Sequence, residues 1–538
     1  MFDRLKKRIR GMFNKVSGKT TLNDVLSIKA AISPLTQQLI KLWCDMYADN
    51  APWLKEPTAK DPERITSRGL PAFIAREKAR MAVLEFKSEI TTPKIKTDQL
   101  DENGAQIEVI DGSTERAEFL NENYQQKVIK KLDSVTEYLV AEGGFVIKPY
   151  IMVSGDNEKP VYTMQFDFVH ANMFIPLGFD NTNKFTDAAF IQMKTTDKAV
   201  YYRLERHTLG DNSVTITNTA YKNENATGVK ISDDNSIELG RQIPLTDVPE
   251  WASLTPSSTV NGVDQLLFQY FKMPGANNID PTSPLGVSGY SRAVKQIRDA
   301  DMQYSTYLWE FEGGSLGIDI DRDALKVYEG SDGNDYEMMN TRQRRLYNKV
   351  DLGSEGDTWN IFNPSLRDEN YKNGLQTIEQ RIEDICGLSR GTITEASEEA
   401  RTATELKIQK QRSFAANAEL QQTLEDGLRG LVNIMDIYAT IYNVVGDVVT
   451  LPDGTVNADN KGKYEISFDW DDSIIVDRET ELQQRRDLMH DGIIGEVEQR
   501  MWWTGETEAQ AVAALEKIRK ERLQKADDRM QTGFGDDI

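Results

Sequence analysis

Three segments in the second half of the chain carry apolar residues at helical spacing, which predicts three long helices. The first ends at the paired glycines Gly313 and Gly314, the second spans about residues 370–388 and the third about residues 402–443. At about 1.5 Å per residue the third helix would be about 60 Å long, which favours an elongated assembly over a compact enzyme. The periodic positions are Val294, Ile297, Asp301, Tyr304, Leu308 and Phe311, then Leu375, Ile378, Ile382 and Ile385, and finally Leu424, Leu428, Leu431, Met435, Tyr438 and Tyr442.

Between Gly143 and about Lys222 the apolar spacing changes to two. Five strand-length runs, "GGFVIKPYIMV", "VYTMQFDFV", "AAFIQMKTT", "AVYYRLERHT" and "SVTITNTAYK", alternate with turn signals such as "SGDNEKP" and "GDN". This order predicts an antiparallel meander. Helices are expected before it, at residues 24–48 and 70–89. After the longest helix we expect the strand "KYEISFDW" and terminal helices. The predicted class is α+β and predominantly helical.

A polar segment, "GTITEASEEARTATEL" (Gly391 to Leu406), separates the second and third predicted helices. It contains almost no large apolar side chain, although a short turn would be enough to connect two helices. A surface loop without a function is the simplest interpretation. We also expect Thr402 or Thr404 to cap the long helix that follows, with Glu405 near its positive end.

Length and composition limit the class of protein. A chain of 538 residues, 39% hydrophobic and 28% charged, is expected to form two to four folded domains. No run of eighteen apolar residues is present, so no membrane span is expected. The two cysteines, Cys44 and Cys386, are typical of buried residues in a reducing compartment.

The charge is unevenly distributed. The net charge is −22, whereas residues 1–20 carry seven lysines and arginines against the single carboxylate of Asp3. Tight nucleic-acid binding depends on Lys and Arg that displace counterions, so this acidic chain is a poor tight binder. It is still compatible with DNA that moves past without being held. The basic terminus is either a partner-binding arm or an ordinary terminus.

The sequence offers little support for catalysis. His170, His207 and His490 are scattered, and we find no GxSxG or CxxC motif. The segment "SGKTT" lacks the first glycine of a phosphate-binding loop, because Phe13 occupies that position. Two acidic clusters, Asp319/Asp321/Asp323 and Asp469/Asp471/Asp472, fit solvated faces better than divalent-ion sites. We therefore expect neither enzyme activity nor a cofactor.

The order of these elements resembles the portal proteins of tailed bacteriophages, particularly those of siphophages of Gram-positive hosts. Four segments carry the resemblance, and together they span about 250 residues in the family's order. They are "GVSGYSRAVKQIRDADMQYSTYLWEFE", "LQTIEQRIEDICGLSRGTIT", "RTATELKIQKQRSFAANAELQQTLEDGLRGLVNI" and "KYEISFDWDDSIIVDRETELQQRRDLMHDGIIGEVEQRMW". No single segment is diagnostic, because none of them is a catalytic motif.

The resemblance implies a portal fold built of wing, stem, clip and crown regions. Residues 1–285 would form the first part of the wing, which contains the meander at 143–222. Residues 286–312 and 369–388 would form stem helices on either side of a clip at 313–368. A tunnel loop at 389–402 would lead into a long wing helix at 403–445. A wing strand and linker at 446–480 and a crown at 481–538 would complete the chain.

The resemblance also implies a non-enzymatic ring in the virion, located at the unique capsid vertex and assembled in the host cytoplasm. The dodecameric ring would let double-stranded DNA pass non-specifically during packaging and ejection. Its partners would be the terminase large subunit, the head-tail adaptor, and the major capsid and scaffolding proteins. A membrane would have no part in it. The alternative is another phage head structural protein, such as a minor capsid or adaptor protein.

Three sets of residues are assigned to sites through this resemblance. The tunnel-loop residues would present small polar and acidic groups to passing DNA, the clip residues would contact DNA or an acidic partner, and the stem residues are charged positions on the two stem helices. The tunnel-loop set is Thr392, Thr394, Glu395, Ser397, Glu398, Glu399 and Arg401. The clip set is Arg342, Arg344, Arg345 and Lys349, and the stem set is Arg292, Lys295, Arg298, Asp301, Lys372 and Arg381.

Overall fold

The structure is a computed structural model in which the chain forms two compact units, Met1–Asp469 and Trp470–Ile538. The described residues are 20–26, 34–54, 65–84, 86–100, 106–154, 161–224, 237–314, 317–321, 327–329, 335–337, 347–350, 359–362, 365–394, 403–450, 456–470, 478–504 and 510–520.

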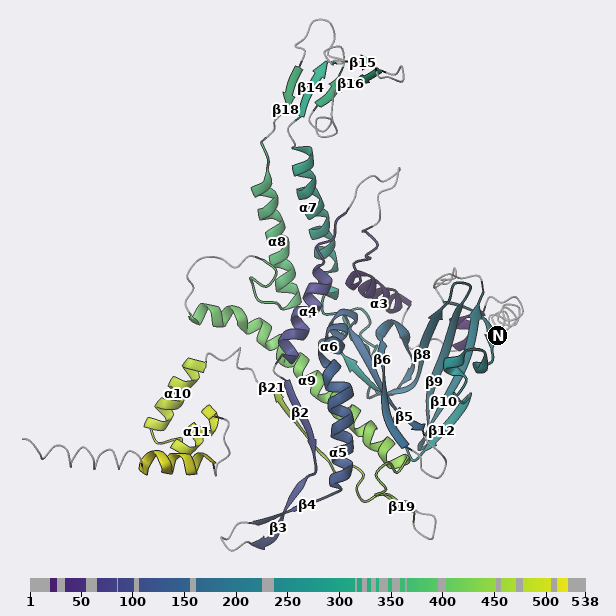
Figure 1. Ribbon diagram of the computed structural model, residues 1–538, viewed down its shortest axis with the longest axis vertical. Coiled ribbons are helices and arrows are strands. Elements are labelled where there is room, and N and C mark those ends of the chain that lie inside the picture. The colour runs from purple at the N-terminus through teal and green to yellow at the C-terminus, as the bar shows by residue number, and fades with distance from the viewer. Residues whose placement is uncertain are drawn as a thin grey trace, which may run out of the picture. The chain divides into compact units, whose positions relative to one another are not determined.

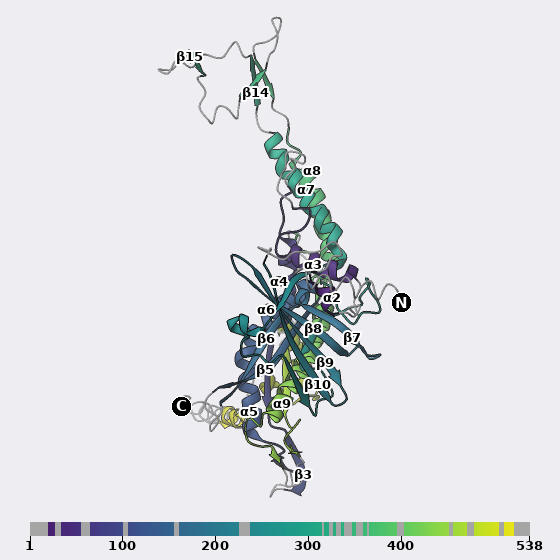
Figure 2. The same ribbon diagram turned by 90° about the vertical axis from the view of Figure 1, so that its right-hand side faces the viewer.

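The first unit contains eight α-helices among its described residues, and Figures 1 and 2 show where they lie. Local signals set several of their ends. Ser113 precedes α5 and its hydroxyl accepts from the backbone N–H of Arg116 at 3.3 Å, and Gly143 ends α6 at a φ of 84°. The helices are α2 (Leu22–Leu26), α3 (Pro34–Tyr47), α4 (Leu70–Val83), α5 (Thr114–Asn123), α6 (Leu132–Glu142), α7 (Val294–Gly313), α8 (Asp368–Cys386) and α9 (Ala403–Ile441).

The larger sheet has seven strands in the order β1-β11-β10-β9-β8-β7, with β12 paired to β10. All of its strand pairs are antiparallel. One face packs into a core that includes Ile191, Tyr202 and Leu204, together with Leu22 and Leu26 of α2. The strands are β1 (Thr20–Thr21), β7 (Phe174–Phe179), β8 (Phe185–Thr195), β9 (Val200–Gly210), β10 (Ser213–Asn223), β11 (Glu238–Ile243) and β12 (Ser257–Asn261).

A second, three-stranded sheet has the order β13-β5-β6, from β13 (Gln269–Lys272), β5 (Gly144–Ser154) and β6 (Val161–His170). The two sheets are joined by buried charge. Lys148 of β5 donates to Glu205 of β9 at 2.6 Å, and His207 contacts the same carboxylate at 2.7 Å. Burying charged groups normally costs free energy, so Lys148 and Glu205 are stabilised here by pairing with each other.

The longest helix, α9, runs through the first unit and packs against β5, β13, α4 and α5 (Figures 1 and 2). Five of its six predicted apolar positions are buried, which confirms the helical pattern, whereas Tyr442 lies beyond the end of the helix and is 37% exposed. Arg116 of α5 is 2% exposed and reaches Asp436 of α9 at 2.7 Å. The same guanidinium also pairs with Asp447 at 3.0 Å.

The helices α7 and α8 lie side by side and run in opposite directions (Figures 1 and 2). Both were predicted at nearly these bounds. The segment between them contains β14 (Gly317–Asp321), which pairs with β17 (Tyr347–Val350) and β18 (Trp359–Phe362). A separate ribbon joins β15 (Val327–Glu329) to β16 (Asp335–Glu337).

The second unit is helical in its described part. It contains α10 (Arg478–His490), α11 (Glu496–Thr504) and a helical stretch at 510–520. Arg485 of α10 lies 4.5 Å from the ring centre of Trp502 in α11. The unit begins at Trp470, earlier than the boundary predicted at residue 481.

Two predictions of local structure are wrong. The helix expected over residues 70–89 ends at Val83, and β2 (Phe86–Thr91) follows, because Ser88 and Ile90 alternate with exposed neighbours and pack as a strand. The strand β2 pairs with β21 (Glu465–Trp470). The expected single meander is divided between two sheets, since β6 pairs with β5, β5 pairs with β13, and neither pairs with β8.

The α+β class is confirmed. The predominance of helix is not confirmed, because strands occupy most of residues 144–272. Two further ribbons complete the described part of the first unit. They pair β3 (Lys94–Leu100) with β4 (Gln106–Ile110), and β19 (Val449–Thr450) with β20 (Val456–Asn457).

Candidate functional site

The pair α7–α8 and the turn after α8 form the candidate site, because most of the described residues assigned through the resemblance lie there. At one end of the pair, Arg367 before α8 donates to Glu310 of α7 at 2.7 Å. Glu310 also accepts from the backbone N–H of Arg367 at 3.1 Å. This bidentate pair fixes the end of α7 beside the start of α8, although Arg367 itself is 62% exposed.

At the other end, residues 65–69, here named the strap, connect α4 to both helices of the pair. Asp301 of α7 accepts from the backbone N–H of Arg68 and from the indole N–H of Trp53, each at 2.9 Å. The hydroxyl of Ser305 accepts from the backbone N–H of Thr66 at 2.7 Å. The Arg68 guanidinium then pairs with Glu379 of α8. The strap therefore holds α7 and α8 in one orientation relative to α4.

Burial shapes the electrostatics of this contact. Asp301 is 2% exposed and Glu379 is 6% exposed. Desolvation by burial raises the pKa of both carboxyl groups, and it outweighs the opposing hydrogen bond to Trp53 and the Arg68 cation. These carboxyl groups therefore depend on the strap for their stabilisation.

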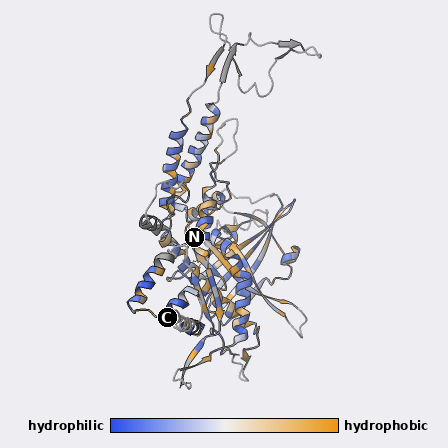
Figure 3. Cartoon of the chain, turned by 60° about the vertical axis from the view of Figure 1, so that its left-hand side comes forward, coloured by the Kyte–Doolittle hydropathy of each residue, from blue (hydrophilic) through white to orange (hydrophobic). Residues whose placement is uncertain are grey.

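The pair leaves apolar surface uncovered on α7. Trp309 is 61% exposed, and Met302, Leu308 and Phe311 are each between 37% and 41% exposed. Figure 3 shows hydrophobic residues among the hydrophilic ones along the two helices. The described exposed positions of α8 are polar, including Lys372, Thr377 and Arg381. Exposed large apolar groups that cluster on one helix are typical of a surface that binds another protein.

The turn at residues 387–394, here named the anchor turn, follows α8. Two of the predicted tunnel-loop residues, Thr392 and Thr394, lie in it, and Thr392 is half-buried. Thr394 is 8% exposed, and its hydroxyl lies 3.2 Å from both carboxylate oxygens of the fully buried Glu383. The hydroxyl of Thr392 donates to the carbonyl oxygen of Ser389 at 2.7 Å. The assignment of Thr394 to an exposed surface is therefore wrong, because its side chain satisfies a buried carboxylate.

The long helix begins at Ala403, so Thr404 lies inside it and is not its cap. Thr402 precedes the helix but lies outside the described residues. The same holds for the remaining tunnel-loop residues, Glu395, Ser397, Glu398, Glu399 and Arg401, and for the clip residues Arg342, Arg344 and Arg345. Lys349 is on β17, where side chains lie outside the description.

The stem residues separate into two groups. Arg292, Lys295, Arg298, Lys372 and Arg381 are exposed at the start of α7 or along α8. Asp301 is instead buried under the strap. Sequence reasoning missed Arg68, Glu379 and Glu383. A signal existed for the last two, because they lie among Leu375, Ile382 and Cys386 on the apolar face of α8, where a carboxylate requires a partner.

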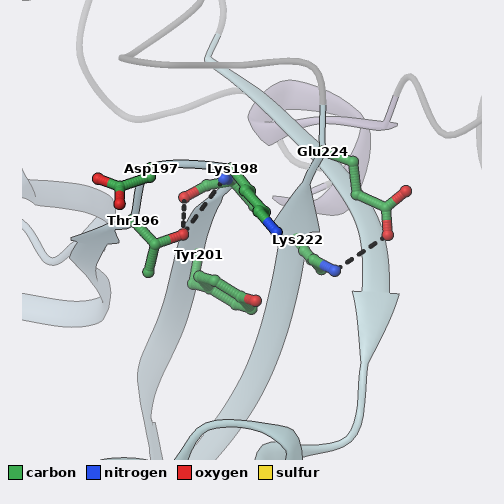
Figure 4. A pocket seen from close by; sticks show the side chains of 7 residues that line it. Thr196, Asp197, Lys198, Tyr201, Lys222 and Glu224 are labelled. Atoms are coloured by element: carbon green, nitrogen blue, oxygen red, sulfur yellow. Dashed lines mark hydrogen bonds and ion pairs between the residues drawn. The ribbon is translucent and has the colours of Figure 1, made fainter.

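A separate hollow of about 450 Å³ opens on the larger sheet, and Figure 4 shows its lining. Lys222 pairs with Glu224 at 3.1 Å, and the hydroxyl of Thr196 donates to the carbonyl oxygen of Ala199 at 2.9 Å. Both charge signs are present and Lys222 is already paired, so the hollow favours no particular ligand. The lining residues are Thr196, Asp197, Lys198, Ala199, Tyr201, Lys222 and Glu224.

Within the described part of the chain, no group of three or more His, Cys, Asp or Glu side chains is arranged to hold a metal ion. No helix in that same part is long and apolar enough to cross a membrane.

No protein-family model matches the chain, and no curated protein matches it. Among solved structures, the chain is similar to a chain of the structure described as "Neck of native GTA particle computed with C12 symmetry". The sequence identity is 10%, the match covers 92% of this chain and 99% of the other, and the TM-score is 0.32. A TM-score of this size does not establish a shared fold, and no function is transferred from it.

Proposed function

We propose that the protein is a phage portal subunit, which forms a ring at the capsid vertex through which double-stranded DNA is packaged and ejected. The observation that carries the proposal is the pair α7–α8, which brackets a small sheet, is held to the body by the strap, and exposes apolar residues on α7. The residue patterns that resemble the portal family supply the same order of elements.

The uncovered surface of α7 is the physical reason to expect a ring. A protein that exposes Met302, Leu308, Trp309 and Phe311 along one helix lowers its free energy by covering them. In a ring, each copy contacts its neighbours through two different surfaces, and helix pairs packed side by side provide them.

The acidic balance of the chain is compatible with a channel. The 64 lysines and arginines are outnumbered by 86 aspartates and glutamates, so the net charge of −22 opposes tight binding of the phosphate backbone and DNA would move through without being held. The proposed role is structural. The energy for DNA movement would come from a separate ATPase, the terminase, and the segment between α7 and α8 would contact that motor and later the head-tail adaptor.

The first test is the assembly state of the purified full-length protein. Native mass spectrometry and negative-stain microscopy should show closed rings with a central hole. Trp309→Glu should reduce ring formation at least tenfold without changing the circular dichroism spectrum, because it places a carboxylate on the apolar surface. The matched control Thr377→Glu changes an exposed residue of α8 and should leave rings intact.

A wild-type protein that remains a monomer at high concentration would exclude the portal proposal. Rings alone would not separate a portal from another ring-forming head protein. Particles made with Trp309→Glu should therefore also lack packaged DNA, measured as nuclease-protected DNA per particle. Full packaging by particles that contain the ring-deficient variant would count against the proposal.

A further inference from the structure

Glu383 is a carboxylate without solvent exposure in the last turn of α8. Its Oε1 accepts from the backbone N–H of Ile393 at 2.7 Å and from that of Thr394 at 3.0 Å. The hydroxyl of Thr394 lies 3.2 Å from each of its oxygens. Three donors of the anchor turn therefore converge on one side chain of the preceding helix.

The anchor turn is also tied at two other points. The hydroxyls of Ser389 and Ser413 are 2.7 Å apart, which joins the turn to α9. Arg390 of the turn pairs with Asp384 of α8 at 2.6 Å, with its side chain 45% exposed. Of these three ties, that of Glu383 is completely buried. It is therefore the least weakened by competing water and salt.

An apolar side chain at position 383 could fill the same buried site without the free-energy cost of desolvating a carboxylate. Burying a carboxylate costs free energy unless hydrogen bonds replace its hydration, and here backbone N–H groups and a hydroxyl do so. Such a contact fixes two successive backbone amides, Ile393 and Thr394, in direction as well as position. The geometry is thus suited to orienting the chain at the end of the turn.

We infer that Glu383 is a positioning residue that fixes the backbone of Ile393 and Thr394 at the end of the anchor turn. This inference rests on the proposed function, in which DNA passes through the ring, and on the resemblance, which assigns Thr394 to the part of the chain beside that DNA. The buried contact would give the end of the anchor turn the same conformation in every copy of the ring. Loss of the contact would release Ile393 and Thr394 and impede DNA movement.

The experiment compares Glu383→Gln and Glu383→Met in the full-length protein. Glutamine keeps an oxygen that can accept from both amides, whereas methionine fills a similar volume without an acceptor. Hydrogen exchange of the peptide covering residues 387–394 should accelerate about tenfold or more in Glu383→Met and less than about threefold in Glu383→Gln. Packaged DNA per particle should fall with the methionine variant and recover with glutamine.

Asp384→Asn is the matched control, because it weakens the exposed pair with Arg390 and leaves the buried contact intact. Its packaging should remain within about twofold of wild type. Unchanged exchange in Glu383→Met would overturn the inference, as would accelerated exchange with normal packaging. If Glu383→Met and Glu383→Ala both fail to fold while Glu383→Gln folds, Glu383 serves general folding and the positioning role is also overturned.

Failure of the proposed function gives a different result. In that case the wild-type protein forms no rings and its particles show no dependence on this chain for packaging. The exchange result would then still report whether Glu383 holds the anchor turn, separately from any role in DNA movement.

Discussion

Replacing Arg68 with methionine should loosen the helix pair α7–α8 from the strap. The guanidinium pairs with Glu379, whose side chain is 8% exposed, and lies 5.0 Å from the ring centre of Tyr304. Methionine keeps most of the aliphatic packing of arginine and removes its charge. The backbone N–H of residue 68 still donates to Asp301, so the variant isolates the contribution of the side chain.

The magnitude follows from what the change leaves behind. Glu379 would be a buried carboxylate with no cation, one helical turn from Glu383. Glu379 can become neutral by binding a proton, which at pH 7.5 costs about 4 kcal/mol for a glutamate of ordinary pKa. This cost is the upper limit on the loss in the free energy of unfolding. Arg68 is 27% exposed, so water partly compensates its loss. We expect a loss of about 2 kcal/mol in the free energy of unfolding.

The loss should depend on pH in a defined direction. Burial already raises the pKa of Glu379 in the wild-type protein, and removing the neighbouring cation raises it further. A group whose pKa is higher in the folded state stabilises the fold below its unfolded pKa, and this contribution disappears as pH rises through the folded pKa. The deficit of Arg68→Met relative to wild type should therefore grow between pH 5 and pH 8.

The assay is urea unfolding of the full-length protein, followed by circular dichroism and by hydrogen exchange of α8, at pH 5, 6.5 and 8. Arg80→Met is the control, because Arg80 is 59% exposed and its ion pair with Glu77 is long at 3.7 Å. The control should cost less than about 0.5 kcal/mol. Equal stability of the two variants, or a deficit in Arg68→Met that does not change with pH, would refute the proposed role of the pair.

Four further outcomes are expected. His170 contacts Glu142 at 2.7 Å and this hydrogen bond raises its pKa, so the stability that wild type gains over His170→Gln should be full below about pH 6.5 and decline above it in thermal unfolding. Burial lowers the pKa of His207, so the advantage of wild type over His207→Gln should decline in the opposite direction, as pH falls below about 6.5. In α9, Gly427→Ala should cost about 1–3 kcal/mol in urea unfolding, because a Cβ there would overlap the ring of Phe271. Gly374→Ala in α8, where the nearest atom is 3.8 Å away, should instead stabilise by up to about 1 kcal/mol.

The helices that could be predicted are those whose apolar residues repeat over many turns. α7, α8 and α9 have this property, and their predicted bounds agree with the structure to within a few residues. The strands of residues 144–222 were also predictable, because alternation and turn residues mark each of them. Their division into two sheets was not, since the partner of β5 is β13, more than a hundred residues later in the chain.

The candidate site was only partly predictable for a related reason. The polar composition of residues 391–406 indicated a distinct segment after α8. Thr394 was nevertheless assigned to an exposed surface, because its partner, Glu383, could not be identified from spacing alone. The strap was missed altogether. Arg68 and Glu379 are far apart in the chain, and their pairing depends on how α4 packs beside α8. A charged residue on an apolar helix face signals that a partner exists without indicating which residue it is.

The two helices of the candidate site differ in a way that matters for the proposed ring. α8 uses its apolar face inward, places Glu379 and Glu383 within that face, and turns polar groups such as Thr377 and Arg381 outward. Near its end, α7 instead exposes the apolar side chains of Trp309 and Phe311. In a ring with a water-filled channel, apolar side chains are stabilised when they are buried between copies. Polar side chains are most stable where they keep their hydration, beside water and DNA. The asymmetry therefore favours α7 at the contact between neighbouring copies and α8 toward the solvent.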